Sequence, residues 1–266
     1  MKQIFIIFLA ILVFCLSGCA KEKNYSAPAK EQELGYFSPA RSVILNFAST
    51  DCIIVGDFKT NCWLYPLDGE TEGSRPCVVI DPGGDAHLII ERLKEIDWVP
   101  RYIFLTHGHL DHIAALPDLI EAFEKGVFGN NPVPKVGIHR GDANYLGKNA
   151  LKIHVDTFGG DLAYVKTLWK PSNDADILFE EGDEAGPFRV LHIPGHTPGS
   201  AGFYDEKEGV LFSGDTLFKW SRGRTDLTGG DEALMQESLK RLLSMQEETI
   251  VLSGHGLDTT IKDRKY

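Results

Sequence analysis

The segment of residues 106–112, Thr-His-Gly-His-Leu-Asp-His, carries four side chains that could bind a metal ion. Imidazole nitrogens and carboxylate oxygens are common ligands of divalent metal ions, and such an ion can generate hydroxide from water at neutral pH. The segment follows the apolar run of residues 102–105, so it lies at the end of a predicted strand. This arrangement predicts metal-assisted hydrolysis. The four candidate ligands are His107, His109, Asp111 and His112.

Three more candidate ligands lie farther along the chain, and each follows a short β-prone run that ends in glycine or proline. His196 stands in Gly-His-Thr-Pro-Gly-Ser, Asp215 in Ser-Gly-Asp-Thr and His255 in Gly-His-Gly. Loops that leave one edge of a sheet are a common place for a site assembled from distant segments. We therefore expect these three side chains to join the first four. The other four histidines are expected to have no metal role: His87, His139, His154 and His192.

These four motifs together resemble the metallo-β-lactamase superfamily. Within it, the Gly-Arg-Thr-Asp segment at residues 223–226 resembles the glyoxalase II-like hydrolases. The resemblance covers residues 43–262 and implies an α/β fold, the αβ/βα four-layer sandwich. Because the sequence ends at Tyr266, we expect the short form, without the C-terminal helical domain of longer glyoxalase II enzymes.

The resemblance also implies how the ligands divide between two divalent metal ions. A metal-bridging hydroxide would be the nucleophile, and Asp111 would serve as a catalytic residue as well as a ligand. Zinc is favoured, although histidine and carboxylate ligands also accept iron and manganese. The first ion would be held by His107, His109 and His196, the second by Asp111, His112 and His255, and Asp215 would bridge the two.

The implied reaction is hydrolysis of a small-molecule thioester or related acyl substrate, as in hydroxyacylglutathione hydrolases. A persulfide dioxygenase-like enzyme with one iron is the nearest alternative, but His255 completes a second metal site. A β-lactam hydrolase is another, although those enzymes usually lack an aspartate at the position of Asp215. A catalytically idle metal-binding lipoprotein is the fourth reading, and the full set of seven ligands argues against it.

Two features near these motifs bear on the substrate. Lys219, Arg222 and Arg224 form a small basic group in an acidic chain, and they either bind a substrate carboxylate or are solvated loop charges. Residues 126–172 form a segment that is enlarged relative to compact superfamily members, and its loops are expected to shape the site.

The overall composition is that of an ordinary globular protein. The chain has 266 residues, 43% of them hydrophobic, which suffices for one large two-sheet core. The formal net charge is −11, and no basic stripe is visible. We therefore expect no nucleic-acid partner.

The N-terminal residues 1–18 are typical of a signal peptide, with a charged start and an uncharged apolar run at residues 4–16. Leu-Ser-Gly-Cys at residues 16–19 resembles a bacterial lipobox, which implies cleavage before Cys19 and lipid attachment to its sulfur. The protein would then be extracytoplasmic and held to a membrane by its lipid, on the outer membrane facing the periplasm in a Gram-negative cell. A cleaved signal without lipid and an uncleaved anchor remain alternatives.

Residues 19–39 read as a flexible tether and residues 40–266 as the catalytic domain. In that domain Asp85 and Asp231 are expected to cap helices, and residues 113–125 to form one helix. Early strands are expected at residues 42–47, 52–55, 62–65 and 77–80. The three remaining cysteines are expected to be packing residues, with a Cys52–Cys62 bridge left open; they are Cys52, Cys62 and Cys77.

Overall fold

The computed structural model describes residues 40–44, 49–69 and 73–264. The predicted signal peptide, the lipidation site Cys19 and the tether at residues 19–39 therefore lie outside the described residues. Residues Ser38–Tyr266 form one compact unit. No helix in the described part of the chain is long and apolar enough to cross a membrane.

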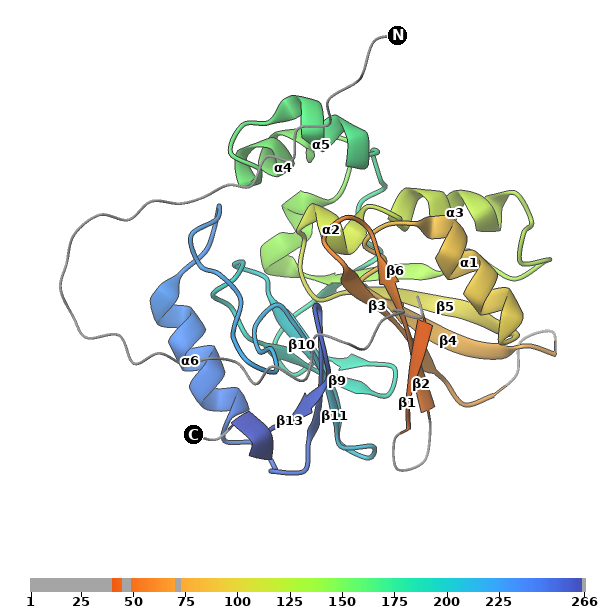
Figure 1. The fold of residues 1–266 in the computed structure, drawn as a ribbon. Coiled ribbons are helices and arrows are strands. Elements are labelled where there is room, and N and C mark those ends of the chain that lie inside the picture. Colours follow the sequence, from red (N-terminus) through yellow and green to blue (C-terminus); the bar gives the residue numbers. More distant parts are fainter. Residues whose placement is uncertain (1–39, 45–48, 70–72, 265–266) are drawn as a thin grey trace, which may run out of the picture. The chain divides into compact units, whose positions relative to one another are not determined.

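The first of two β-sheets has seven strands in the order β1-β2-β3-β4-β5-β6-β7 (Figure 1). The pairs β1–β2, β2–β3 and β3–β4 are antiparallel, and the pairs β4–β5, β5–β6 and β6–β7 are parallel. The strands are β1 (Ala40–Ile44), β2 (Ser49–Val55), β3 (Thr60–Pro66), β4 (Arg75–Ile80), β5 (Trp98–Leu105), β6 (Lys135–His139) and β7 (Ile177–Phe179).

The second sheet has six strands in the order β13-β12-β11-β10-β9-β8. Only β11 and β12 are parallel neighbours in it. The strands are β8 (Glu184–Ala185), β9 (Phe188–His192), β10 (Ala201–Asp205), β11 (Val210–Gly214), β12 (Ile250–Ser253) and β13 (Thr259–Thr260).

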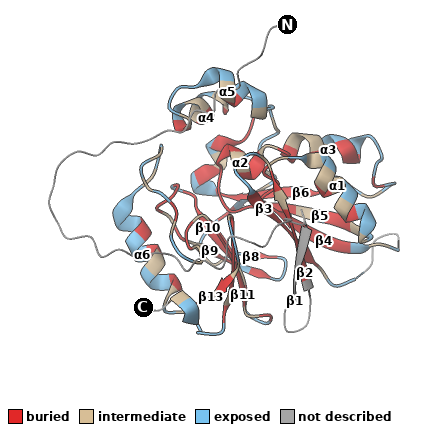
Figure 2. Ribbon diagram, in the orientation of Figure 1, coloured by how far each residue is buried: buried red, intermediate tan, exposed pale blue. Residues whose placement is uncertain are grey.

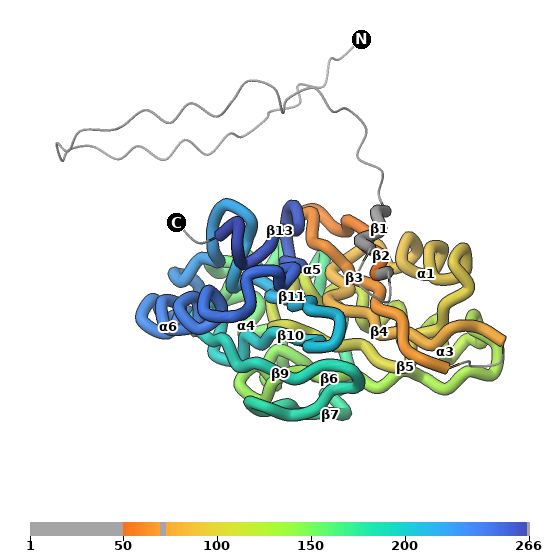
Figure 3. The backbone as a smooth tube through the Cα atoms, turned by 90° about the horizontal axis from the view of Figure 1, so that it is seen from below, coloured from red at the N-terminus to blue at the C-terminus, as the bar shows by residue number. Residues whose placement is uncertain are grey.

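Helices cover the outer face of each sheet, so the fold is the four-layer αβ/βα sandwich that the sequence predicts. Three helices lie on the first sheet and one on the second, on opposite sides of the pair (Figures 1 and 3). Buried strands fill the middle, while the helices expose their outward faces (Figure 2). These helices are α1 (Ala86–Glu95), α2 (Leu110–Ile113) and α3 (Leu116–Glu124), then α6 (Glu232–Leu242).

The central strands are buried on both faces, which explains their continuous apolar sequences. In β4, Val78 and Ile80 belong to the core between the sheets, whereas Val79 packs toward α1 and α3. The alternation follows from the two-residue period of a strand. A third core joins the second sheet to α6 through residues such as Leu211 and Leu242.

Two predictions about helices are wrong in part. Asp85 precedes α1, but its φ of 47° is left-handed and its side chain makes no cap; its Oδ2 accepts a hydrogen bond from Gly56 N at 2.8 Å instead. The helix expected over residues 113–125 is divided between two helices. α2 begins earlier, within the metal-ligand motif, and ends at Ile113, and α3 covers residues 116–124. Asp231 does cap α6, accepting from Leu234 N at 3.0 Å.

The three cysteines of the described residues are buried and form no disulfide. Cys62 belongs to the core under α1 and α3, whereas Cys52 belongs to the core between the sheets. The two side chains thus point to opposite faces of the first sheet, so a Cys52–Cys62 bridge is excluded by geometry. The expectation that they are packing residues is confirmed.

The enlarged segment between β6 and β7 is folded. It contains a 3-10 helix (η1, Arg140–Tyr145) and two short α-helices, α4 (Leu151–Thr157) and α5 (Leu162–Leu168). Figure 1 shows α4 and α5 on the same side of the sandwich as α2, the helix that carries Asp111 and His112. A second 3-10 helix, η2 (Lys262–Arg264), follows β13.

Candidate metal centre

The candidate ligands follow the ends of four strands, one in the first sheet and three in the second. His107 and His109 lie in the loop after β5, and Asp111 and His112 lie in α2 directly behind it. His196 follows β9, Asp215 follows β11 and His255 follows β12. The structure brings all seven together, although as many as 148 positions, from residue 107 to residue 255, separate them in the chain.

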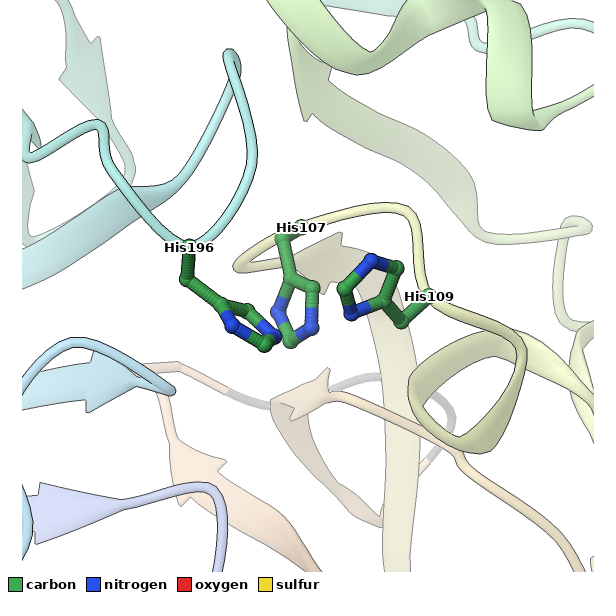
Figure 4. Close-up of side chains that lie close together, drawn as sticks. All are labelled: His107, His109 and His196. Carbon is green, nitrogen blue, oxygen red and sulfur yellow. The ribbon is translucent and has the colours of Figure 1, made fainter. Parts of the chain in front are cut away.

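Three histidines converge at the first position. The ring centroids of His107 and His109 are 4.8 Å apart, those of His109 and His196 are 4.5 Å apart, and those of His107 and His196 are 4.8 Å apart. Figure 4 shows the three rings turned toward one another. One nitrogen from each lies within 4.8 Å of the others, a spacing that one metal ion can span.

The free atoms of this group fit a metal ion. In the described residues, the Nε2 atoms of His107, His109 and His196 and one oxygen of Asp215 are buried without a hydrogen-bond partner. Buried polar atoms are nearly always satisfied, so four unsatisfied atoms in one place fit a bound metal ion. Neutral imidazoles and a carboxylate form a donor set that zinc accepts, as do iron and manganese.

A second group lies next to the first, with Asp215 between them. Asp215 Oδ1 is 3.5 Å from His112 Nε2, and its Oδ2 is 3.7 Å from His196 Nε2 and 3.4 Å from His255 Nε2. Asp111 Oδ2 is 3.4 Å from His255 Nε2 and 3.6 Å from His112 Nε2. These atoms can hold a second ion that shares the Asp215 carboxylate with the first.

Asp81 orients two parts of the centre from behind. It is buried, and its carboxylate accepts hydrogen bonds from the backbone N and the hydroxyl of Thr106 at 2.8 and 2.7 Å. Its Oδ2 is also 2.9 Å from His112 Nδ1, so the Nε2 of that ring is left for the metal. His196 is fixed in the same way, because its Nδ1 lies 2.7 Å from the carbonyl oxygen of Arg224. Such outer contacts set the orientation of ligand rings.

Asp142 joins the loops of the two sheets and was not identified from the sequence. Its buried carboxylate accepts from Gly108 N at 2.9 Å, between the first two ligands, and from Thr197 Oγ1 at 2.7 Å and Gly199 N at 2.6 Å, beside the ligand His196. A single aspartate in a predicted loop carries no sequence signal for this role. Burial raises its pKa, while the three hydrogen bonds act in the opposite direction.

The histidine pKa values are shifted in opposite directions in the two groups of ligands. Burial, with the neighbouring His112, lowers the pKa of His107, and burial with His196 lowers that of His109 to about 3. The carboxylates of Asp111 and Asp215 outweigh burial at His255 and raise its pKa to about 9. Metal ions bind neutral imidazole, so His107 and His109 are ready for an ion, whereas His255 must lose a proton to bind one.

The predicted substrate-binding cations have partners within the chain. Arg222 Nη2 pairs with Glu232 Oε1 at 2.9 Å, and Arg224 makes two 2.7 Å contacts with Asp226. Lys219 Nζ lies 5.0 Å from the centre of the exposed Trp220 ring. These pairings favour the hypothesis that the two arginines are surface loop charges over the hypothesis that they bind a substrate carboxylate.

The fold and the site together define a metal-binding α/β sandwich of the hydrolase type. Residues 55–255 match the family model described as "Metallo-beta-lactamase superfamily". The chain belongs to this superfamily, whose members are metal-dependent hydrolases.

Two relatives resemble most of the chain. Hydroxyacylglutathione hydrolase GloC of Haemophilus influenzae is 34% identical over 216 residues, which are 81% of this chain and 94% of that protein. The probable metallo-hydrolase YqgX of Bacillus subtilis is 35% identical over 212 residues, 78% of this chain and 90% of that protein.

Two solved structures share the fold at similar identity. BLEG-1, described as a B3 metallo-β-lactamase, is 36% identical with a TM-score of 0.67, covering 81% of this chain and 95% of its own. TTHA1623, solved in a di-iron-bound form, is 34% identical with a TM-score of 0.64, covering 80% of this chain and 96% of its own.

Proposed function

We propose that this protein is a dinuclear metal-dependent hydrolase of thioesters, similar to the hydroxyacylglutathione hydrolases. The position of Asp215 supports this most directly, because its two oxygens face the two histidine groups at 3.4–3.7 Å. The 34% identity to GloC, a hydroxyacylglutathione hydrolase, supports the thioester as substrate.

Different residues would hold the metal ions, face the substrate and orient the ligands. Two divalent ions, of which zinc is the one we propose, supply hydroxide at neutral pH and polarise the acyl carbonyl when they are bound. Asp111 has the more exposed of the two ligand carboxylates, at 17% against 10% for Asp215, so it is the one that a substrate can reach. Asp81 and Asp142 keep the ligand rings and loops in place.

The test is turnover by the purified, zinc-loaded protein. We expect two metal ions per chain and release of free thiol from S-D-lactoylglutathione. Replacing the bridging carboxylate, in Asp215→Ala, should remove most of that activity, by at least the roughly 100-fold that loss of a metal-positioning group costs. In the protein as purified, before zinc is added, one iron per chain with oxygen uptake on glutathione persulfide would overturn the proposal in favour of the dioxygenase-like alternative.

A β-lactam hydrolase is the second candidate, because BLEG-1 is 36% identical and carries that description. Turnover of a cephalosporin above that of the thioester by the same zinc-loaded preparation would favour it. Two metal ions without turnover of either substrate would leave a metal-binding role.

We also propose that the protein is extracytoplasmic and anchored to a bacterial membrane through a lipid on Cys19. The lipobox-like residues 16–19 after an apolar run support this location. Radiolabelled palmitate should enter the wild-type protein in a bacterial host and should not enter Cys19→Ala. Equal labelling of the two proteins, or no labelling of either, would contradict lipid anchoring at Cys19.

A further inference from the structure

The ligands are not equally accessible, and the difference shows where a substrate approaches. The side chain of His196 is 4% exposed and that of His112 is fully buried. By contrast, the side chains of Asp111 and His255 are 17% and 26% exposed. A substrate therefore reaches the centre over Asp111 and His255.

The turn between β2 and β3 borders this accessible side. Thr60, the first residue after the turn, has its Oγ1 3.5 Å from Asp111 Oδ2 and forms a backbone bridge with His255. The turn is also held at its start, where Gly56 N donates to the carboxylate that precedes α1 at 2.8 Å. Phe58 lies within the turn, two residues before Thr60, and is 45% exposed, so the anchored turn presents a large apolar side chain at the surface.

Phe58 is one of three aromatic residues that meet here. Its ring centroid is 5.9 Å from that of Phe158, which follows α4, and 6.4 Å from that of Tyr164 in α5. Phe158 and Tyr164 are 5.6 Å apart, and all three pairs are edge-on or tilted. We call these three residues the aromatic cluster. The enlarged segment thus supplies two of its members.

Tyr145 connects the enlarged segment to the metal centre. Its ring centroid lies 5.8 Å from that of His109 and 5.7 Å from that of His154 in α4. Phe158 directly follows this helix, so the aromatic cluster lies on a segment that contacts the first group of ligands.

We propose that the aromatic cluster binds the acyl part of the substrate and gives the enzyme a preference for apolar acyl groups, a conclusion that rests on the proposed thioesterase function. Partly exposed aromatic rings gain free energy when an apolar group covers them.

The test varies only the acyl group, using acetyl, hexanoyl and phenylacetyl thioesters of N-acetylcysteamine. The wild-type enzyme should prefer the two larger groups. Phe58→Ala and Phe158→Ala should each lower kcat/KM for these two by roughly 5- to 30-fold, the effect of losing one apolar contact surface, and change it less than about 3-fold for acetyl. Phe58→Leu, which keeps an apolar side chain, should retain most of the preference for hexanoyl.

Leu162→Ala is the matched control, because Leu162 lies on α5 and is 42% exposed but does not belong to the aromatic cluster. It should leave the acyl preference unchanged. Equal losses for acetyl and hexanoyl in Phe58→Ala and Phe158→Ala would overturn the inference while leaving the thioesterase function intact.

A binding measurement separates failure of the inference from failure of the function. Calorimetry with the zinc-loaded protein should show hexanoate and phenylacetate binding at least about 10-fold more tightly than acetate, and Phe58→Ala should remove the difference. This result supports the cluster even if no thioester is cleaved. Equal binding of the three acids by the wild-type protein would contradict it.

Discussion

Asp81 holds two ligand elements at once, because its carboxylate contacts both Thr106, next to the first histidine, and the ring of His112. It takes this position with a φ of 55°, at the end of β4. These three contacts fix the position of the Asp81 carboxylate. The orientation of His112 therefore depends on a residue that is not itself a ligand.

We expect Asp81→Asn to weaken zinc binding by about 10- to 100-fold, the usual effect of losing a carboxylate that orients a ligand histidine. Competition with a chromophoric chelator measures this directly. Asp118→Asn is the control, since that carboxylate is at the surface in an ion pair with Lys170. Equal zinc affinity of Asp81→Asn and the wild type would show that Asp81 does not orient the ligand.

At the scale of elements, the two sheets contribute different ligand loops, and η1 joins them. Asp142 in η1 accepts from the loop after β5 through Gly108 and from the loop after β9 through Thr197 and Gly199. The fit is close, because a Cβ added at Gly199 would lie 2.3 Å from Asp142 N. The enlarged segment therefore supports the metal centre as well as supplying the aromatic cluster.

Asp142→Asn should lower the free energy of unfolding by about 1–3 kcal/mol, because an amide cannot accept all three hydrogen bonds and leaves a buried N–H unsatisfied. Urea denaturation of the metal-free protein measures the loss. Asp156→Asn is a matched control in the same enlarged segment, since Asp156 is exposed and forms a surface ion pair with Lys152. A change below about 0.5 kcal/mol in Asp142→Asn would contradict the role, being the size expected for surface substitutions.

At the scale of the whole molecule, a pair of stacked histidines connects the two sheets outside the metal centre. The ring centroids of His139, at the end of β6, and His192, at the end of β9, are 4.0 Å apart with an interplanar angle of 14°. His139 Nδ1 accepts from Gly141 N at 3.1 Å, and His192 Nε2 lies 2.9 Å from the carbonyl oxygen of Pro198. Both histidines have structural contacts, as expected for residues without a metal role.

This pair should make the stability of the fold depend on pH. Burial and the neighbouring His192 lower the pKa of His139 from the ordinary histidine value of about 6.5 to about 4. The folded state then binds fewer protons than the unfolded state between these values, so the contribution of His139 is present above pH 6.5 and is lost as the pH falls toward 4.

His139→Asn, which keeps an acceptor for Gly141, should therefore show a shallower rise in unfolding free energy between pH 4 and 6.5 than the wild type. Denaturation in the presence of a chelator removes metal binding from the comparison. Identical slopes for the two proteins would refute this contribution of His139.

The sequence by itself predicted the fold class and the seven candidate ligands that the structure brings together. His107, His196, Asp215 and His255 stand in short motifs directly after β-prone runs, and such groupings of metal ligands are rare outside metal sites. The apolar runs at residues 77–80, 103–105 and 210–212 in β4, β5 and β11 indicate strands buried on both faces, which predicts helices outside two packed sheets.

Only the tertiary structure decided what surrounds these ligands. Asp142, Phe58 and Tyr164 are ordinary residue types with no local signal, and their roles come from contacts with segments distant in sequence. Asp85 has a cap-like sequence position, but the left-handed backbone there and a long-range bond to Gly56 override it. Local sequence motifs predict the metal ligands because metal binding needs particular side-chain atoms. The residues that hold the ligands in place or contact the substrate act through packing, which many different sequences can provide.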